Sequence, residues 1–436
     1  MSLPAASSPS ISSFPVHSTL DSTRIPSTPL SRFADRPSSA RYMIGIMSGT
    51  SMDGVDAVVA DFNTNEKNPN GSTRGQQLSH IFLPMPAELK EKLLLINSPV
   101  SDPSLGGELH LAAILSNSLA HLYADAIRTL LQHSGLSHDS ILAVANHGQT
   151  VRHRPECGYT IQLSNNSLLA ELIGIPVIGD FRSRDVAAGG TGAPLVPPFH
   201  EYWFNQGTLQ SGMFILNLGG IANITHITPS TSGSNQSTVN GFDTGPANVL
   251  SDIWINEKRG LSYDHEGEWA KSGTVNDELL NLLLDEEYFR RSPPKSTGRD
   301  LFHRPWLETK LQHFHHLTHA DIAATLIELT AVTVTDAIKA TSIVSPSPSS
   351  SSSSSSYEPV FVCGGGARNC HLLTRLIHHL PHRRVESSLS HGLDVDTVES
   401  MAFAWFGWKF LNGETANRPK VTGAKGERIL GTYFPA

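Results

Sequence analysis

The chain has 436 residues and a formal net charge of −8, with 39% apolar and 17% charged residues. This length exceeds one ordinary hydrophobic core, so two lobes are expected. The acidic balance argues against a surface for nucleic acid or anionic membrane, and no apolar stretch approaches the roughly 18–20 residues that span a bilayer. The 3 cysteines include no Cys-x-x-Cys pair, which excludes a disulfide framework and a zinc site and predicts a reducing, cytoplasmic location.

Residues 1–40 are rich in Ser and Pro and show almost no apolar periodicity. This composition predicts a disordered extension. A transit peptide is the alternative, because arginines outnumber acids here, but the prolines are incompatible with an amphipathic helix. The serine tract at 345–356 is likewise predicted to be an unstructured loop.

The first structured stretch, residues 43–60, predicts two strands joined by a tight turn. An apolar run ends at Ser48, small and hydroxylated residues fill 48–51, and the apolar strand pattern resumes at Val55. Gly49 and Gly54 allow the backbone to approach a ligand closely, and the hydroxyls and amides between them suit a phosphate. The alternative is a hairpin that simply needs glycine.

The rest of the chain alternates short apolar runs with helical patterns, which predicts an α/β protein whose sheet has some antiparallel members. Residues 179–185 and 187–198 are interpreted as a turn and a loop, and residues 228–239 as a polar surface loop. The further predicted strands are 78–83, 141–145, 160–163, 176–178, 214–218, 224–227 and 360–363, and the predicted helices are 87–95, 105–133, 167–173, 275–284, 320–342, a segment ending at 378, and 397–411.

A junction between a strand and a glycine turn occurs three times, at 48–54, 218–223 and 363–369. Ligands in open α/β sheets bind beyond strand ends, so three such turns suggest backbone cradles that face one cleft. No Walker P-loop and no Gly-x-Gly-x-x-Gly after a strand is present. Phosphates would be held instead by backbone amides of facing turns, with Mg²⁺ offsetting their charge.

Asp243 lies in a turn of small residues that is expected to open a helix running to about residue 257. Taken alone, the pattern favours Asp243 as a helix N-cap. The alternative is a general base that points into the cleft, since a carboxylate of ordinary pKa is ionised at pH 7 and able to accept a proton.

Eight motifs, in this order, carry a resemblance to a known family. They are Met-Ser-Gly-Thr-Ser-Met-Asp-Gly-Val-Asp at 47–56, Asn-His-Gly-Gln-Thr at 146–150, Gly-Asp-Phe-Arg at 179–182 with Gly-Ala-Pro-Leu at 192–195, Asn-Leu-Gly-Gly-Ile-Ala-Asn at 217–223, Gly-Phe-Asp-Thr-Gly-Pro at 241–246, Lys-Ser-Thr-Gly-Arg at 295–299, Cys-Gly-Gly-Gly-Ala at 363–367 and Met-Ala-Phe-Ala-Trp at 401–405. Over about residues 43–436 the chain resembles the anhydro-N-acetylmuramic acid kinase family, to which fungal levoglucosan kinases are similar.

The resemblance implies the two-lobed α/β ATPase fold of actin, hexokinase and sugar kinases, with ATP in the cleft between lobes. The first lobe would comprise 42–211 and 397–436, and the second 212–396. The resemblance assigns the ATP phosphates to Ser48, Gly49, Thr50, Ser51, Met52, Asp53, Gly54, Asp56, Gly219, Gly220 and Asn223, and the nucleoside to Gly364, Gly365, Gly366 and Asn369. Asp53 is also a weak candidate ligand for Mg²⁺.

The resemblance also makes Asp243 the catalytic base, which reverses the preference for a cap. The substrate candidates are His147, Gln149, Arg182, Asp185 and Glu399. Each keeps a structural alternative: a satisfied core histidine for His147, a salt-bridged turn for the Arg182–Asp185 stretch, and a solvated helix residue for Glu399. Thr191 and Ala247 depart from the family, which usually has Gln and Gly there.

A 1,6-anhydrosugar has no free hydroxyl at C6, so a base cannot activate that oxygen directly. The expected reaction is therefore water attack at C1, assisted by Asp243, with the released bridge oxygen taking the γ-phosphoryl of ATP. The predicted substrate is 1,6-anhydro-N-acetylmuramic acid. The alternatives are levoglucosan, a catalytically silent nucleotide-binding protein, and an ordinary hydroxyl-phosphorylating sugar kinase; a homodimer is implied only by the resemblance.

Overall fold

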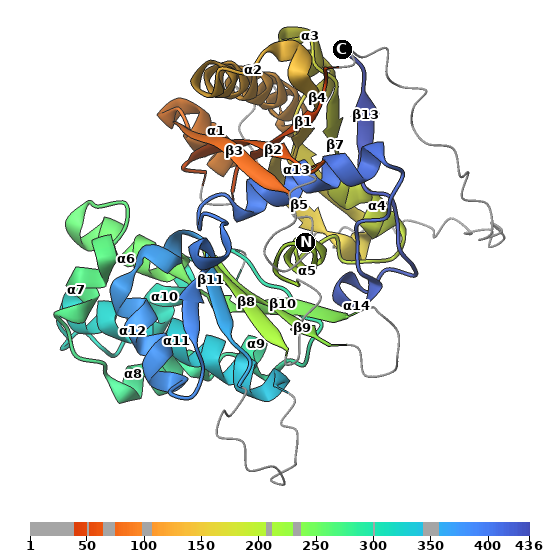
Figure 1. Cartoon of the computed structure of the whole chain (residues 1–436). Coiled ribbons are helices and arrows are strands. Elements are labelled where there is room, and N and C mark those ends of the chain that lie inside the picture. Colours follow the sequence, from red (N-terminus) through yellow and green to blue (C-terminus); the bar gives the residue numbers. More distant parts are fainter. Residues whose placement is uncertain are drawn as a thin grey trace, which may run out of the picture.

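The computed structural model describes residues 39–49, 52–63, 75–97, 107–205, 212–229, 237–299, 301–342 and 357–436. Two β-sheets, each with its own helices, form the two lobes in Figure 1. The predictions for residues 1–38, for Thr50 and Ser51, and for the serine tract fall outside the described residues. None of the described helices is long and apolar enough to cross a membrane.

The first sheet has the strand order β13-β7-β4-β1-β2-β3. Strands β1, β2 and β3 are antiparallel neighbours, whereas β4 and β7 run parallel to β1, and β13 closes the edge antiparallel to β7. The bounds are β1 Tyr42–Met47, β2 Gly54–Asp61, β3 Gln76–Pro84, β4 Ile141–Asn146, β7 Val177–Gly179 and β13 Thr432–Phe434. The predicted pair of strands around residue 48 is therefore confirmed.

Alternation along the strands of this sheet divides its side chains between two cores. Ile44 and Ile46 pack against helices α1 Ala87–Ile96, α2 Glu108–Ser134 and α3 Asn166–Ile173. Met43 and Met47 instead face helix α13 Val398–Leu411. Gly45 permits this close packing, since a Cβ there would lie 2.0 Å from the carbonyl oxygen of Ser400 in α13.

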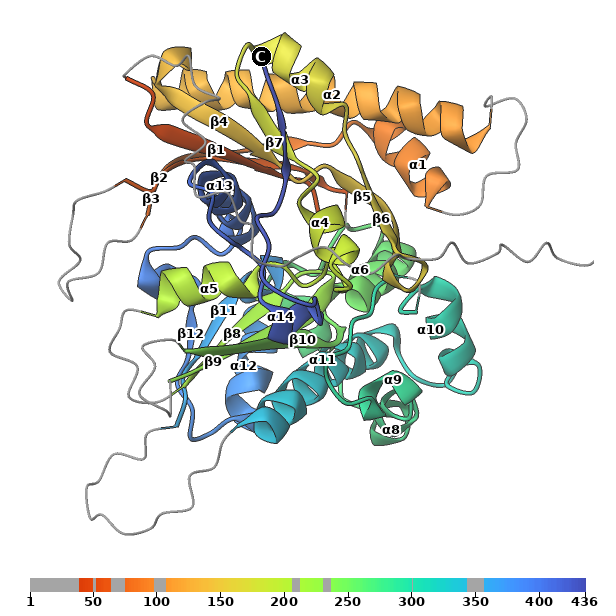
Figure 2. The same ribbon diagram turned by 90° about the vertical axis from the view of Figure 1, so that its right-hand side faces the viewer.

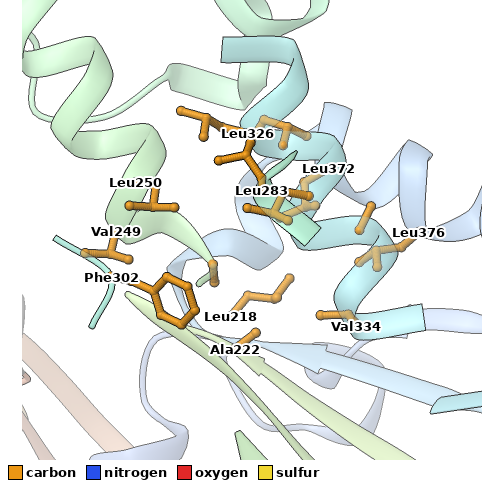
Figure 3. Close-up of a cluster of buried hydrophobic side chains, with 14 of the residues drawn as sticks. Leu218, Ala222, Val249, Leu250, Leu283, Phe302, Leu326, Val334, Leu372 and Leu376 are labelled. Atoms are coloured by element: carbon orange, nitrogen blue, oxygen red, sulfur yellow. The ribbon is translucent and has the colours of Figure 1, made fainter. Parts of the chain in front are cut away.

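The second sheet has the order β10-β9-β8-β11-β12 and repeats the pattern of three antiparallel strands continued by parallel ones. Its strands are β8 Met213–Leu218, β9 Ile221–Thr228, β10 Thr238–Pro246, β11 Val360–Cys363 and β12 Val385–Ser387. One face packs on a helical layer whose core is drawn in Figure 3. That layer contains α6 Asn248–Arg259, α7 Glu268–Lys271, α8 Asp277–Leu284, α9 Glu287–Arg290, α10 Arg304–Leu311, α11 His319–Thr341 and α12 Cys370–His379.

The opposite face of the second sheet packs toward the first lobe. Ile215 and Phe361 share one buried cluster with Met43 of β1, with α13, and with helix α5 Pro197–Phe204. The short helix α14 Pro419–Thr422 also contacts β10. Figure 2 shows α5, α14 and α13 between the two sheets. One segment from the middle of the chain and one from its C-terminal part therefore join the lobes.

The remaining elements are short. Strands β5 Gln149–Arg154 and β6 Tyr159–Leu163 form a separate two-stranded sheet, and helix α4 spans Phe181–Ala187. Single 3₁₀ turns lie at His138–Ser140, Pro155–Cys157, His265–Gly267, Gly365–Arg368 and Ser388–His391.

The predicted α/β class with two lobes is confirmed, and the local predictions fail where tertiary contacts override short patterns. Residues 179–185, predicted as a turn, contain most of helix α4, and α5 begins within the predicted loop at 187–198. Strand β10 extends through Pro246, so the helix predicted to open beside Asp243 begins only at Asn248. Pairing with β9 explains this difference, because a sheet edge fixes an extended conformation that glycine-rich residues do not favour alone.

Candidate active site

Asp243 lies in strand β10, opposite Asn223 of β9, just before a break in the register of these strands. One carboxylate oxygen, Oδ2, accepts a hydrogen bond of 3.0 Å from the backbone N–H of Thr297, and the Tyr288 hydroxyl donates to the Asp243 carbonyl at 2.6 Å. The N-cap of α6 is Ala247, which has no capping side chain. The capping interpretation of Asp243 is therefore wrong.

The carboxylate of Asp243 has an unusual acidity. Burial raises its pKa from 3.8 to about 7, although the hydrogen bond from Thr297 and the positive charge of Arg182 lower it. The expectation of an ordinary pKa is therefore wrong as well. A carboxylate that titrates near neutral pH is a better proton acceptor than an ordinary aspartate, and is still ionised in a large fraction of molecules.

Arg182 on helix α4 is the cation next to Asp243. Its Nε donates to Nε2 of His147 at 3.0 Å, and one terminal nitrogen donates to the carbonyl of Gly192 at 2.8 Å. Burial lowers the pKa of Arg182, whereas Glu399, Asp243 and Asp185 raise it. An arginine remains protonated in proteins, so a fixed positive charge faces carboxylates from β10 and from α13.

His147 and Gln149 flank the glycine at which β4 passes into β5, and both are buried. Burial, and then the charge of Arg182, lower the pKa of His147 well below its usual value, so the ring is neutral. Because arginine can only donate, Nε2 of His147 accepts and the ring proton resides on Nδ1. Gln149 donates to the carbonyl of Gly49 at 3.3 Å, which connects this pair to the first glycine turn.

Three buried polar atoms in this region have no hydrogen-bond partner among the described residues. They are Nδ1 of His147, Oε1 of Gln149 and Oγ1 of Thr297, the residue whose N–H contacts Asp243. Buried polar groups are rarely left unpaired in native proteins. A hydroxylated or charged ligand would supply the missing partners, so these residues fit a polar small molecule.

Glu399 lies on α13, between the lobes, and is mostly buried. Its Oε1 accepts a hydrogen bond of 3.2 Å from the side chain of Asn217, at the end of β8. Burial raises the pKa of Glu399, Arg182 lowers it, and Asp56 raises it. The solvated-helix alternative is therefore wrong, and Glu399 shares one electrostatic environment with Arg182.

The first glycine turn joins β1 to β2, and several of its residues make contacts that stabilise the turn itself. The buried hydroxyl of Ser48 forms a hydrogen bond of 2.9 Å with the hydroxyl of Tyr123. Met52 adopts a φ of 54°. A Cβ at Gly54 would lie 2.4 Å from the ring of Phe82. Asp56 is 2.9 Å from Nε2 of His80. Glycine is thus required at 54 whether or not a ligand binds.

Asp53 of the same turn is the weak metal candidate. Its side chain is 65% exposed and forms an ion pair with Lys90 at 2.8 Å. Among the residues that the structure describes, no group of three His, Cys, Asp or Glu side chains is arranged to hold a metal ion. Since Mg²⁺ usually keeps several waters and binds through one or two carboxylates plus phosphates, Asp53 remains a candidate that would act together with a nucleotide.

The second and third glycine turns meet directly. A Cβ at Gly364, where φ is 78°, would lie 2.3 Å from Oδ1 of Asn217, and one at Gly366 would lie 2.6 Å from Leu218. A Cβ at Gly365 would meet nothing within 4 Å. Glycine is therefore required at 364 and 366 by packing, while Gly365 borders open space.

The remaining residues assigned to these two turns have contacts of their own. The carbonyls of Gly219 and Gly220 accept N–H groups at the start of α6, at 3.0 Å from Asn248 and 2.9 Å from Ala247. Asn223 pairs with Asp243 in the sheet. Asn369 caps α12, since its Oδ1 accepts from the N–H of Leu372 at 2.9 Å. The structure thus gives Asn369 a structural role beside its predicted nucleoside contact.

Asp185 on α4 is fully buried and already satisfied. Oδ2 accepts the N–H of Gly192 at 2.9 Å, and Oδ1 accepts from Asn417 at 2.7 Å and Thr422 at 2.8 Å. All three donors are neutral, so the carboxylate does not act as part of a salt-bridged turn. Its contacts hold the loop after α4 and the C-terminal segment together.

The chain was compared with known protein families and with known proteins. A model of the family "Anhydro-N-acetylmuramic acid kinase" matches residues 41–436. The chain belongs to the anhydro-N-acetylmuramic acid kinase family. Proteins of that name from Pseudomonas fluorescens and Bordetella petrii are 43% and 45% identical to it over 392 and 399 residues, covering 90% and 91% of this chain and 99% and 97% of theirs.

Among solved structures, a ROK family glucokinase from Streptomyces griseus aligns with 83% of this chain and 97% of its own, at 13% identity and a TM-score of 0.33. A likeness this small carries no functional argument. Membership of the anhydro-N-acetylmuramic acid kinase family identifies the chain as an enzyme, an ATP-dependent phosphotransferase.

In this kinase-family chain, sequence reasoning missed some residues that complete the site. Thr297 belongs to a motif noted only for its resemblance, and nothing in its local pattern reveals the contact with Asp243. No motif or pattern in the sequence pointed to Asp252 on α6. Burial, and then the charge of Asp53 in the first glycine turn, raise its pKa to about 7, although Arg299 lowers it.

Proposed function

We propose that the protein is an ATP-dependent hydrolytic kinase of 1,6-anhydro-N-acetylmuramic acid. It would open the 1,6-anhydro bridge with water and phosphorylate O6, giving the 6-phosphate sugar and ADP. The observation that supports this most directly is Asp243, a mostly buried carboxylate with a pKa of about 7, held by the N–H of Thr297 and next to Arg182. Family membership supplies the substrate class.

The proposed reaction requires one base and one phosphoryl acceptor. Asp243 accepts a proton from water as the water oxygen bonds to C1 of the sugar. The bond from C1 to the bridging oxygen breaks, and this oxygen, now attached only to C6, bonds to the γ-phosphorus as ADP leaves. No base could deprotonate O6 beforehand, because it carries no proton while the bridge is intact. Base catalysis of this kind contributes about 10²–10⁴-fold to a rate.

The other residues near Asp243 would bind and orient the sugar. Arg182 supplies a fixed positive charge, and it keeps part of the Asp243 population ionised at neutral pH. Neutral His147 has a donor at Nδ1, and Oε1 of Gln149 is a free acceptor, so the pair offers complementary groups to sugar hydroxyls or an acetamido group. Glu399 would accept from the sugar or order the water.

The nucleotide would lie along the three glycine turns. Ser48–Asp56 and Gly219–Asn223 would hold the phosphates, and Gly364–Asn369 the nucleoside, with the lobes divided as 42–211 plus 397–436 against 212–396. Open space beside Gly365 is consistent with a ligand there. Mg²⁺, when bound, would neutralise charge on the phosphates, with Asp53 as its candidate protein contact. The homodimer and the cytoplasmic location also remain predictions.

Isotope labelling of the product tests this function. Purified protein would be incubated with ATP, Mg²⁺ and either anhydrosugar in ¹⁸O-labelled water, while ADP release is followed and the product analysed by mass spectrometry and NMR. We expect ADP release that depends on 1,6-anhydro-N-acetylmuramic acid, with the label at C1 of the 6-phosphate. Faster turnover of levoglucosan would reassign the substrate, and unlabelled product or sugar-independent ADP release would contradict the hydrolytic mechanism.

A further inference from the structure

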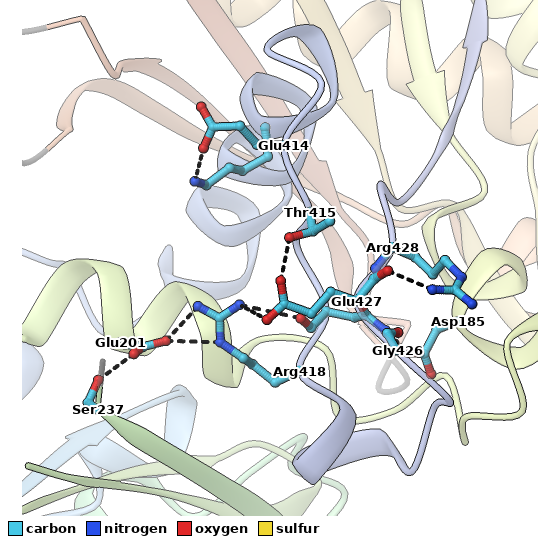
Figure 4. Close-up of polar contacts among 11 residues, drawn as sticks. Asp185, Glu201, Ser237, Glu414, Thr415, Arg418, Gly426, Glu427 and Arg428 are labelled. Carbon is cyan, nitrogen blue, oxygen red and sulfur yellow. Dashed lines mark hydrogen bonds and ion pairs between the residues drawn. The ribbon is translucent and has the colours of Figure 1, made fainter. Parts of the chain in front are cut away.

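The segment between α13 and β13, residues 415–428, contacts helix α4 and the loop that follows it. Figure 4 shows its side chains around Arg418 and Glu427, with Asp185 beside them. Asn417 and Thr422 are buried, and both donate to the same oxygen of Asp185, at 2.7 and 2.8 Å. Asn417 is itself fixed, since its Oδ1 accepts the N–H of Arg428 at 2.6 Å. The far C-terminal region thus holds a carboxylate of helix α4.

The same segment fixes the loop that follows α4. The N–H of Thr191 donates to the carbonyl of Thr422 at 2.7 Å, and the N–H of Lys425 donates to the carbonyl of Ala188 at 2.9 Å. The N–H of Gly192 donates to the other oxygen of Asp185. A Cβ at Gly190 would lie 2.2 Å from that oxygen, so the loop packs tightly on it.

This loop then contacts Arg182. The carbonyl of Gly192 accepts from one terminal nitrogen of Arg182 at 2.8 Å, while Nε of Arg182 donates to His147. Asp185, held by Asn417 and Thr422, therefore fixes Gly192, and Gly192 fixes the guanidinium of Arg182, on which the charges of Glu399 and Asp243 act. Each step in this chain is a hydrogen bond between buried or mostly buried groups.

A second set of contacts links the segment to the strand that carries Asp243. Arg418 donates twice to one oxygen of Glu201 on α5, at 2.8 and 3.1 Å, and the hydroxyl of Ser237 donates to the other oxygen. Ser237 immediately precedes β10. Figure 4 shows these contacts together. One C-terminal segment thus contacts both the α4 side and the β10 side of the candidate site.

We propose that the segment 415–428 positions the candidate site, with Asn417 and Thr422 as positioning residues that act on Arg182 through Asp185 and Gly192. This inference rests on the proposed function for its kinetic consequence. It assigns Asp185 a positioning role in place of the predicted substrate contact. A small displacement of a binding group costs much of the rate, because reacting groups must be held close to their productive geometry.

Thr422→Val removes the hydroxyl that donates to Asp185 and keeps the side-chain shape, whereas Thr422→Ser keeps the hydroxyl. We expect Thr422→Val to raise KM for the anhydrosugar about tenfold, with KM for ATP changed less than about twofold, and Thr422→Ser to restore the wild-type value. Thr335→Val is the matched control, since Thr335 is a buried threonine of α11 whose hydroxyl donates to the carbonyl of Val332. It should lose comparable thermal stability without a change in the sugar KM.

A second measurement does not depend on activity. The ring nitrogens of His147, assigned with His147→Gln, report the contact with Arg182 by ¹⁵N NMR. We expect the Nε2 resonance of His147 to shift in Thr422→Val and to return in Thr422→Ser. An unchanged His147 resonance in Thr422→Val, or an equal rise of the sugar KM in Thr335→Val, would overturn the inference. If the wild-type protein shows no sugar-dependent ADP release, the proposed function fails and the His147 resonance alone decides the positioning role.

Discussion

One fully buried and one mostly buried aspartate, Asp185 and Asp243, influence the same arginine and differ in how many hydrogen bonds they accept. Asp185 accepts three hydrogen bonds from the loop after α4 and from the C-terminal segment. Asp243 accepts one, from Thr297, and burial raises its pKa to about 7. Burial with a single donor raises the proton affinity of Asp243, which suits a base, whereas the three donors of Asp185 tie that carboxylate to the loop after α4 and to the C-terminal segment.

The largest effect is expected at the carboxylate with few donors. Asp243→Asn should reduce turnover of the anhydrosugar by about 10³-fold or more, because the amide cannot accept a proton from water. ATP binding, measured by calorimetry, should remain within a few-fold of wild type. Retention of substantial sugar-dependent ADP release would remove Asp243 from the role of base.

At Asp185, which accepts three hydrogen bonds, a substitution should affect the stability of the fold more than turnover. Asp185→Asn places an amide against the N–H of Gly192, so one buried donor loses its acceptor. We expect a loss on the order of 2–3 kcal/mol in the free energy of unfolding, measured with denaturant at pH 7. The sugar KM should rise, with KM for ATP nearly unchanged. Normal stability in this variant would contradict the structural role given to Asp185.

Whereas Asp185→Asn should destabilise the fold, Asp243→Asn should stabilise it at neutral and higher pH. The pKa of Asp243 is raised in the folded protein from 3.8 to about 7, so the folded state binds more protons than the unfolded state between these values. The wild-type protein therefore loses stability as pH rises from about 4 to about 7, and the variant lacks this loss. At pH 8 the variant should be more stable by up to about 4 kcal/mol, with a smaller difference at pH 4. Equal differences at both pH values would argue against the raised pKa.

The smallest effect concerns the arginine between the two carboxylates. For the wild type, kcat/KM should rise with pH through about 7 as Asp243 loses its proton. Arg182 lowers the pKa of Asp243, so Arg182→Gln should move this rise to higher pH, and Arg182→Lys should move it less. The pH profile of kcat/KM for the three proteins tests this. An unchanged midpoint in Arg182→Gln would show that the rise belongs to another group.

Much of the fold followed from local pattern. The strands around residue 48, the long helices at 105–133 and 320–342, and the α/β class were predicted because apolar periodicity over several residues records which face will be buried. Prediction failed at β10 and α4, where glycine and small residues leave the pattern weak. There the conformation is set by pairing with β9 and by packing beneath the C-terminal segment.

The sequence by itself determined which residues could do chemistry: the order of the motifs pointed to Asp243, Arg182 and Glu399, and to three glycine turns. Only the tertiary structure decided which groups each carboxylate contacts. The pKa of Asp243 depends on burial and on Thr297, and the contacts of Asp185 come from Asn417 and Thr422; all three partners lie far away in the chain. Local sequence does not record these long-range contacts, so it could not separate the candidate base from the carboxylate that supports it.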